Sequence, residues 1–452
     1  MKYFFETYGC QMNKAESASL EWLFIERKWE KAEKPEDADF IVINTCSVRA
    51  TAESRIGGRL GYYTQLRREQ KKAVQSGEIY PFTLVVTGCM AERLKDELKK
   101  QFPVVDYVVV HFQRQHFMDI IAATEKHCEL EKIDEDPVYT FSPLSYEDGT
   151  FQSYVPIMHG CNNFCTYCIV PYVRGREISR SPEAILSEID MLSARKVREI
   201  TLLGQNVNSY KWEDYNGSAL DFPALMKLIA THVRETSSSI EWIRFMSSHP
   251  KDISEKLIDV IAEEDVICRH IHLPVQHGSS RILKKMNRRY SREDYLEKVK
   301  MIRSKLPDVS LTTDIMLGFP GETDEDFEEA VSLLKEVRYE AAFMYYYNPR
   351  NGTPAAEYPD QVPLELKKER LQKVIDTQLE INRAEMAKRI GSTVKVLVEC
   401  VSKDNDAELL GRTEQDEHVV FEAPSSAVGT FVKVKLLELT GNTFKGKLLS
   451  SE

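Results

Sequence analysis

A repeating alternation of strand-like and helix-like segments between residues 154 and 347 constrains the fold more than any other feature. Short apolar runs are followed there by helical stretches six times, and this order favours a parallel sheet covered by helices. A closed barrel of this kind has eight strand–helix units, so six units predict a partial, open-sided (βα)6 barrel. The expected strands are Tyr154–Met158, Glu199–Leu203, Glu241–Met246, His270–Val275, Leu311–Leu317 and Ala341–Tyr347.

The first 120 residues alternate in the same way on a smaller scale. They predict an N-terminal doubly wound parallel α/β domain. A helix is expected between the first two strands, with Asn13 as its N-cap and Glu16 three residues later in a capping-box pattern. The expected strands are Lys2–Thr7, Phe40–Asn44, Thr83–Thr87 and Asp106–Val110.

The remaining stretches have other patterns. Residues 121–153 lack a clear period and contain acidic clusters at 134–137 and 147–149, as is typical of a linker. A helix over 364–390 is expected to follow the barrel, and short alternating strands after it predict a small antiparallel β-barrel. The expected divisions are 1–120 (N-terminal domain), 121–153 (linker), 154–386 (central domain with its trailing helix) and 387–452 (C-terminal barrel).

Hydropathy, charge and cysteine usage narrow the class of protein. No apolar run approaches the ~18 residues that a membrane span needs, and the first residues lack the apolar core of a secretory signal. Nine cysteines without such a signal argue against a disulfide framework, so we expect a cytoplasmic protein whose grouped cysteines bind metal or react. The net charge of −11 argues against a generally basic RNA-binding surface, but it allows a local basic patch.

Cys161, Cys165 and Cys168 form a C-x3-C-x2-C motif just after the first expected barrel strand. The carboxyl ends of barrel strands are where such folds build active sites. Three thiolates at this spacing can hold an iron–sulfur cluster and leave one iron open, because a [4Fe–4S] cluster normally has four cysteine ligands. A structural zinc site is the alternative, but it needs a fourth ligand, and no second local pair of cysteines or histidines follows.

Three other cysteines each lie just past the carboxyl end of an expected N-terminal strand. They are Cys10, Cys46 and Cys89. In a parallel sheet these ends share one edge, where ligands bind, so we expect the three thiols to converge on a second site. The alternative is that each is a small buried apolar residue, a common fate of free cysteine. The remaining cysteines, Cys128, Cys268 and Cys400, match no such pattern and are interpreted as structural.

The segments 160–172 and 174–180 resemble the methylthiotransferase family of the radical S-adenosylmethionine (SAM) superfamily, and the resemblance covers almost the whole chain. It implies two [4Fe–4S] clusters, one on Cys161, Cys165 and Cys168 and an auxiliary one on Cys10, Cys46 and Cys89. It also implies SAM, used once as methyl donor to sulfur and once as radical source. The product would carry C–S–CH3 in place of an aromatic C–H, which a carbon radical can attack and an ordinary side-chain base cannot.

The resemblance also implies further SAM contacts at the ends of barrel strands. Gly204-Gln205-Asn206 lies where many superfamily members have Gly-Gly-Glu, which contacts the SAM amino group. Polar residues at the ends of the third and fourth expected strands are further candidates. The expected SAM-binding residues are Gln205, Asn206, Ser247, His249 and Gln276. No residue is assigned as catalytic beyond the clusters.

Two more resemblances concern the substrate. The C-terminal region is similar to TRAM domains, which bind RNA, and Arg412, Lys433 and Lys435 are the expected RNA contacts. The segment 8–13 resembles the MiaB branch of the family, which acts on N6-isopentenyladenosine at position 37 of tRNA. The implied product is 2-methylthio-N6-isopentenyladenosine. The implied partners are the tRNA anticodon stem-loop and a reductant such as flavodoxin or ferredoxin; no membrane is involved, and a monomer is expected.

Other functions remain open from the sequence. Related branches modify threonylcarbamoyl-adenosine in tRNA or an aspartate of a ribosomal protein. A non-catalytic iron–sulfur protein that binds RNA or transfers electrons is an alternative from another class. Reductive cleavage of SAM to 5′-deoxyadenosine separates the enzymes from this last alternative.

Overall fold

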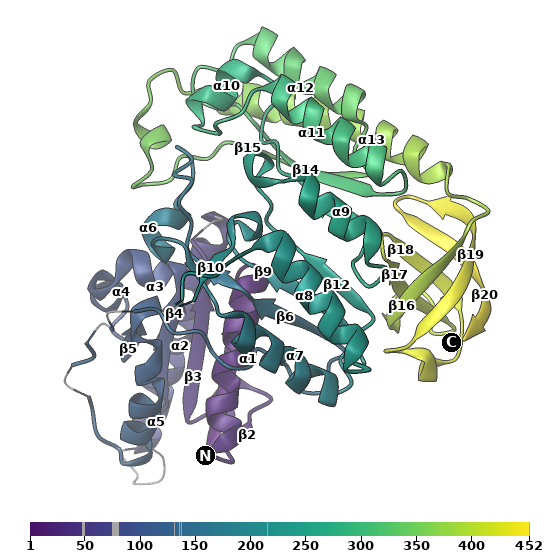
Figure 1. Ribbon diagram of the computed structural model, residues 1–452. Coiled ribbons are helices and arrows are strands. Elements are labelled where there is room, and N and C mark those ends of the chain that lie inside the picture. Colours follow the sequence, from purple (N-terminus) through teal and green to yellow (C-terminus); the bar gives the residue numbers. More distant parts are fainter. Residues whose placement is uncertain are drawn as a thin grey trace. The chain divides into compact units, whose positions relative to one another are not determined.

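The computed structural model describes residues 1–47, 50–74, 81–130, 132–134, 136, 138–214 and 216–451, and Figure 1 traces the chain. The chain divides into two compact units. The first comprises residues 1–162 and 169–191, and the second comprises residues 163–168 and 192–452. In the expected acidic linker cluster at 134–137, Glu135 and Pro137 lie outside the described residues.

The first unit contains the expected N-terminal parallel sheet. Its five strands are hydrogen-bonded in the order β2-β1-β3-β4-β5, and every pairing is parallel. Strands β3 and β4 are buried almost completely, as expected for central strands covered on both faces. The strands are β1 (Lys2–Thr7), β2 (Glu30–Lys31), β3 (Phe40–Thr45), β4 (Thr83–Gly88) and β5 (Tyr107–Val109).

Helices cover both faces of this sheet. Apolar residues of α2 and α4 pack with Ile41, Ile43 and Val86 on one face. Those of α1 and α5 pack with Phe40 and Val42 on the other. This arrangement confirms the doubly wound prediction. The helices are α1 (Gln11–Glu26), α2 (Ala50–Val74), α3 (Cys89–Leu94), α4 (Asp96–Gln101) and α5 (Phe117–Glu125).

The capping box expected at Asn13 and Glu16 is wrong. Helix α1 begins at Gln11 with Cys10 as its N-cap, so Asn13 and Glu16 lie inside the helix. The Asn13 amide is buried and donates to Asn44 Oδ1 at 2.8 Å and to the Thr45 carbonyl at 3.0 Å. These tertiary hydrogen bonds use the side chain that the local pattern assigned to a cap.

The first expected barrel strand belongs to the first unit and is interrupted. It is observed as β6 (Gln152–Pro156) and β7 (Met158–His159), and β7 pairs antiparallel with β8 (Ile178–Ser179). The short helix α6 (Val170–Arg174) follows the cysteine loop and packs against α3. Helix α7 (Pro182–Ala194) begins after it, as expected from the proline at its first position.

The second unit contains the remaining barrel strands. Strands β9 (Glu199–Leu203) and β12 (Trp242–Phe245) are parallel neighbours. Strands β13 (His270–His272), β14 (Ser310–Leu317) and β15 (Ala341–Tyr346) form a second parallel set. A hairpin of β10 (Lys211–Glu213) and β11 (Ala219–Asp221) was not expected. The helices are α8 (Phe222–Glu235), α9 (Glu255–Glu263), α10 (Ser280–Lys285), α11 (Arg292–Lys305), α12 (Asp324–Val337) and α13 (Leu364–Ala387).

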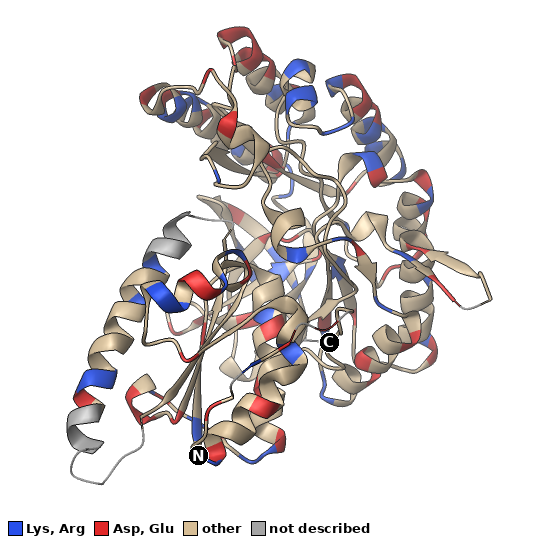
Figure 2. Ribbon diagram, turned by 90° about the vertical axis from the view of Figure 1, so that its left-hand side faces the viewer, with Lys and Arg blue, Asp and Glu red and all other residues tan. Residues whose placement is uncertain are grey.

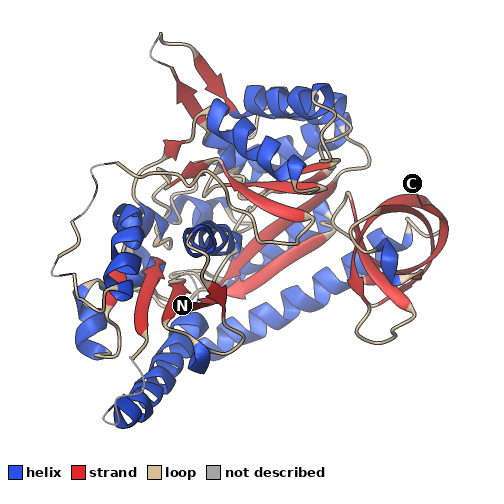
Figure 3. Cartoon of the chain, turned by 90° about the horizontal axis from the view of Figure 1, so that it is seen from below, coloured by secondary structure: helices blue, strands red, loops and turns tan. Residues whose placement is uncertain are grey.

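The last five strands close into the expected small barrel, which appears as a ring near the C-terminus in Figure 3. Their order is β16-β17-β18-β20-β19, and every pairing is antiparallel except the parallel pair β18–β20. A closed ring with an odd number of strands cannot alternate throughout, so one parallel pair is unavoidable. The strands are β16 (Thr393–Val401), β17 (Glu408–Thr413), β18 (His418–Glu422), β19 (Phe431–Thr440) and β20 (Thr443–Ser451).

Candidate active site

Three cysteines follow the aligned ends of neighbouring strands in the first unit. Thr7 of β1 and Thr87 of β4 are both in register with Asn44 of β3. Cys10, Cys46 and Cys89 come within three residues of these positions. The structure therefore brings the three together at the carboxyl edge of the sheet, where a parallel sheet binds its ligands.

Glycines next to these cysteines let the backbone segments approach closely. A Cβ at Gly9 would lie 3.0 Å from the Cβ of Cys46. Gly88, with φ of +90°, could carry no side chain, because a Cβ there would overlap the Thr45 carbonyl oxygen. Cys46 and Cys89 are buried, whereas Cys10 is exposed. Burial raises the pKa of the Cys89 thiol to about 11, so deprotonation there needs a compensating cation.

A buried ion pair lies beside these cysteines. Nη1 of Arg174, at the end of α6, donates to Glu16 Oε1 at 2.9 Å, and both side chains are at most 4% exposed. Arg114 adds a second guanidinium 3.6 Å from the same carboxylate oxygen. Burial alone would lower the pKa of Arg174, but the charges of Cys89, Glu16 and Cys10 raise it well above its usual value. Arg174 is therefore a permanent cation facing the thiols.

Two buried histidines adjoin this pair. The His159 ring stacks on Tyr139, with centroids 3.8 Å apart, and meets His111 edge to face at 5.2 Å. Burial, reinforced for His111 by Arg174 and for His159 by His111, lowers the pKa of both rings well below the usual value. Both histidines are therefore neutral, and their ring nitrogens have no hydrogen-bond partner among the residues that the structure describes. Burying a ring nitrogen without a hydrogen-bond partner costs free energy, so a pair of such histidines is an unusual feature of a protein interior.

In the second unit, the segment after α10 holds the cysteine loop. The backbone amide of Thr166 donates to the Met286 carbonyl at 3.1 Å, and the side-chain amide of Asn287 donates to the Phe164 carbonyl at 3.0 Å. The buried Arg288 donates to Cys165 Sγ at 3.4 Å. A cationic donor at this distance stabilises a thiolate, so the loop is suited to binding metal as thiolate.

Arg288 is fixed by further hydrogen bonds. It donates to the Tyr290 hydroxyl at 2.9 Å, to the Tyr167 hydroxyl at 3.3 Å and to the Pro274 carbonyl at 2.8 Å. Burial alone would lower the pKa of Arg288, but the charges of its neighbours raise it well above its usual value. Neither Arg288 nor Arg174 was predicted from the sequence as a site residue. Arg174 lies in a segment that carried the family resemblance, whereas no local signal marks Arg288.

Near the ends of β9 and β12 lie buried polar atoms that have no hydrogen-bond partner within the described part of the chain. Gln205 Oε1, Asn206 Oδ1 and His249 Nε2 belong to residues expected to contact SAM. Ser248 Oγ and both side-chain polar atoms of Asn208 share this property and were not predicted as site residues. Buried polar atoms are almost always paired in a complete structure. This group therefore fits a polar ligand with several donors and acceptors, such as SAM.

His249 is an uncharged member of this group. Burial, and then the charges of Arg288 and Lys251, lower its pKa to about 2. Its Nδ1 accepts from the Lys251 amide at 3.3 Å, which leaves Nε2 as the position that carries the proton. His249 is therefore a neutral hydrogen-bond donor to a ligand.

Ser247 and Gln276 have left-handed backbones, with φ of +72° and +73°. Such conformations in non-glycine residues cluster at functional sites. Gln276 Oε1 accepts from the Tyr345 hydroxyl at 3.0 Å, and its Nε2 lies 3.5 Å from Asp314 Oδ2. Gln276 is thus held by strands β14 and β15, with its amide oriented by both neighbours.

In the C-terminal barrel, the expected basic residues differ in their surroundings. Arg412 donates to Glu199 Oε1 at 2.6 Å and to Glu399 Oε1 at 3.0 Å, and it also pairs with Asp416. Its guanidinium thus links the barrel to β9, and an RNA contact by Arg412 remains a prediction. Lys433 and Lys435 are exposed on β19, opposite the buried Val432, Val434 and Leu436.

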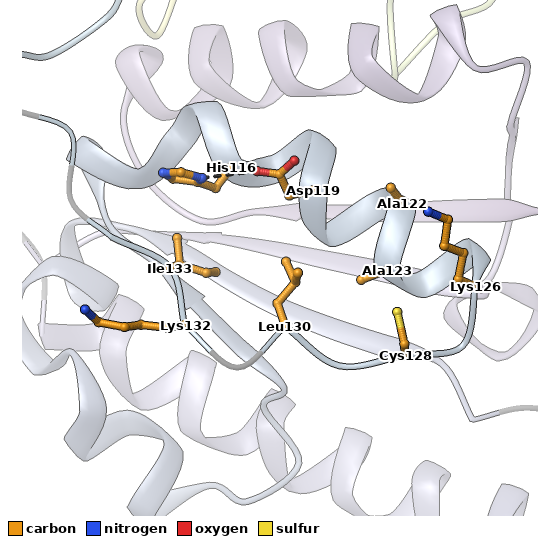
Figure 4. Close-up of a pocket in the computed structure, with 9 residues that line it drawn as sticks. All are labelled: His116, Asp119, Ala122, Ala123, Lys126, Cys128, Leu130, Lys132 and Ile133. Atoms are coloured by element: carbon orange, nitrogen blue, oxygen red, sulfur yellow. Dashed lines mark hydrogen bonds and ion pairs between the residues drawn. The ribbon is translucent and has the colours of Figure 1, made fainter.

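A surface pocket lies elsewhere in the first unit (Figure 4). His116, residues of α5 and residues of the following segment line it, and none is an expected site residue. The pocket-lining residues are His116, Asp119, Ala122, Ala123, Lys126, Cys128, Leu130, Lys132 and Ile133. Among the residues that the structure describes, no three His, Cys, Asp or Glu side chains converge as a single metal ion requires. Thiolates of a cubane cluster each bind a different iron and need not converge on one point.

Within the described ranges, no helix has the length and apolar character to cross a membrane.

Three family descriptions match successive parts of the chain. Residues 2–110 match "Uncharacterized protein family UPF0004", residues 155–334 match the radical SAM superfamily, and residues 387–449 match the TRAM domain. Among solved structures, the radical SAM methyltransferase TsrM from Kitasatospora setae has a TM-score of 0.60 at 14% identity. The match covers 78% of this chain and 77% of that protein, and it supports the fold alone.

Curated relatives match over nearly their whole length. A tRNA-2-methylthio-N(6)-dimethylallyladenosine synthase of Treponema denticola is 51% identical over 99% of this chain and 100% of its own. A protein of the same name from Bacteroides thetaiotaomicron is 44% identical over 99% of this chain and 96% of its own. The chain is therefore a radical SAM enzyme and belongs to the tRNA-2-methylthio-N(6)-dimethylallyladenosine synthase family of methylthiotransferases.

Proposed function

We propose that this chain methylthiolates C2 of N6-isopentenyladenosine at position 37 of tRNA, giving 2-methylthio-N6-isopentenyladenosine. The observation that carries the proposal is that Cys10, Cys46 and Cys89 meet at one sheet edge of a chain that also has the C-x3-C-x2-C loop. The names of full-length relatives agree with this reaction.

Each set of three thiolates would hold a [4Fe–4S] cluster with one open iron. When bound, the clusters and SAM would supply the radical, the sulfur and the methyl group. Gln205, Asn208 and the neutral His249 would bind SAM through their unpartnered atoms. Arg288 would donate a hydrogen bond to Cys165 Sγ and keep the loop in place.

Lysines of the C-terminal barrel would bind the RNA backbone. Lys435 on β19 lies directly opposite Lys447 on β20, and both are exposed. Like charges on facing strand positions repel each other, which destabilises the strand pair. Binding of an anionic ligand such as the RNA backbone offsets this repulsion. Elsewhere positive and negative residues are interspersed along the helices (Figure 2), in keeping with the acidic total. Lys433, Lys435 and Lys447 therefore form the proposed RNA-binding lysine stripe.

The reaction would take place in the cytoplasm, where tRNA is modified, with the chain acting as a monomer. The anticodon stem-loop would be the recognised part of the tRNA, because unpaired loop bases can be splayed out for a protein. The electron for SAM cleavage would come from a small redox protein such as flavodoxin or ferredoxin.

The test is to incubate anaerobically reconstituted protein with SAM, dithionite and tRNA carrying isopentenyladenosine. Mass spectrometry of the digested nucleosides should find one methylthio group in place of one hydrogen, together with 5′-deoxyadenosine. Parallel reactions contain threonylcarbamoyl-adenosine tRNA or ribosomal protein, and a product in either of these alone would overturn the substrate assignment. Absence of 5′-deoxyadenosine in all reactions would favour a non-catalytic iron–sulfur protein.

A further inference from the structure

Helix α6 belongs to the first unit and packs beside an auxiliary cysteine. It begins two residues after Cys168, and its residue Val173 shares a small apolar cluster with Cys89. The amide of Cys161 donates to the carbonyl of Gly175 at 3.1 Å, just past the end of the helix. Arg174, between Val173 and Gly175, is thereby fixed against the auxiliary cysteine site.

Arg174 and a second guanidinium meet a single buried carboxylate. Arg174 and Arg114 share the single carboxylate of Glu16, through contacts of 2.9 Å and 3.6 Å. The two guanidinium groups therefore outnumber the carboxylate that they share, and Arg174 is the one that acts on Cys89 and Cys10. In a poorly solvated interior such a charge acts strongly on its neighbours.

We propose that Arg174 is a positioning residue of the auxiliary site, where its buried guanidinium, held by Glu16, stabilises the negative charge of the thiolates and of the iron–sulfur group they would bind. The inference rests on the proposed function and deepens it. The reduction potential of an iron–sulfur group depends on local charge and hydrogen bonding. Adding one electron makes the group more negative, so the cation should raise its reduction potential.

The experiment isolates the auxiliary cluster in the full-length chain. Alanine at Cys161, Cys165 and Cys168 removes the other cluster, and the protein is reconstituted anaerobically with iron and sulfide. The one-electron potential is then measured by EPR-monitored titration with dithionite and mediators. In this background Arg174→Met should lower the reduction equilibrium constant about tenfold, or ~59 mV, while Glu16→Gln should raise it by a similar factor.

Three further variants separate charge from structure. Arg174→Lys keeps the charge and should recover most of the potential, and the double variant of Glu16→Gln with Arg174→Met should return close to the parent value. The matched control is Arg180→Met, which breaks the buried Arg180–Glu188 pair of the same unit. Arg180 donates to carbonyls of Pro156 and Ala184, and its loss should leave the potential unchanged.

Arg174→Met and Glu16→Gln are expected to shift the reduction potential in opposite directions, and this difference in sign tests the inference. If Arg174→Met and Glu16→Gln shift the potential in the same direction, or not at all, the inference is overturned and the proposed function stands. If Arg174→Met does not fold, Glu16→Gln decides alone, and an unchanged or lowered potential overturns the inference. If the background protein binds no cluster, the auxiliary site itself is refuted, and the proposed function with it.

Discussion

The two cysteine sites are built in different ways. Cys161, Cys165 and Cys168 lie within eight residues of sequence, so chain connectivity alone keeps them near one another. Cys10, Cys46 and Cys89 are separated by 36 and 43 residues and meet only because β1, β3 and β4 pair in register. The loop site therefore depends on local contacts, whereas the auxiliary site depends on the folded sheet.

The largest effects are expected when one set of cysteines is removed at a time, which tests whether the two sites have separate roles. Alanine at Cys161, Cys165 and Cys168 should abolish both 5′-deoxyadenosine and the methylthiolated nucleoside. Alanine at the three N-terminal cysteines should abolish the methylthiolated nucleoside and leave 5′-deoxyadenosine formation in place. Chromatography with mass detection measures both products. If the second variant also loses 5′-deoxyadenosine, the two sites do not have separate roles.

Asn13→Leu should damage the auxiliary site through the fold. Its buried amide bonds Asn44 and Thr45, and losing it leaves two buried acceptors unsatisfied, at a cost of about 2–4 kcal/mol. Denaturant unfolding measures the loss, and iron retained on the N-terminal cysteines should fall with it. Lys14→Ala, at the exposed neighbouring position, should change the unfolding free energy by less than ~0.5 kcal/mol. Equal effects of both variants would contradict the role assigned to Asn13.

Arg288→Met is the matching change at the loop site. It leaves Cys165 Sγ without its cationic donor and removes one of the two hydrogen bonds to the Pro274 carbonyl, at a cost of about 1–3 kcal/mol. Iron should be lost from the loop cysteines and kept by the auxiliary set, as followed by iron content in each triple-alanine background. Arg289→Met, at an exposed position, is the control. Loss of iron from the auxiliary set alone would refute the assignment.

The smallest expected effect lies outside both sites, on the lysine stripe. Lys435→Ala and Lys447→Ala should each weaken tRNA binding and reduce the slope of log affinity against log salt by about 0.9. Lys445→Ala should have a smaller effect, because Lys445 lies opposite Glu438. Filter binding over a salt series measures this, with iron content and SAM cleavage unchanged. An unaltered salt slope would place the RNA contact elsewhere.

The sequence predicted features that depend on periodicity and spacing. The strands β1, β9 and β14 match their expected ranges to within one residue, because alternating apolar segments report burial directly. The placement of Cys10, Cys46 and Cys89 at one edge of the sheet was predictable because the carboxyl ends of parallel strands lie on the same side. A capping box at Asn13 failed, since its side chain bonds Asn44, 31 residues away.

Side-chain partners across long sequence separations could not be predicted. Arg288 contacts Cys165 from 123 residues away, and Arg174 pairs with Glu16 from 158 residues away. The guanidinium of Arg412 pairs with Glu199 from 213 residues away, a partner that the sequence did not indicate, and its RNA contact stays a prediction. Local pattern reports whether a residue is charged or buried, and only the fold determines which partner it meets.

The most direct test of two separate cysteine sites is the iron and acid-labile sulfide content after anaerobic reconstitution. The parent chain should bind about eight irons, as two cubane clusters require. Alanine at Cys161, Cys165 and Cys168, or at Cys10, Cys46 and Cys89, should each leave about four. A parent content of about four irons, or loss of all iron from either variant, would contradict the account.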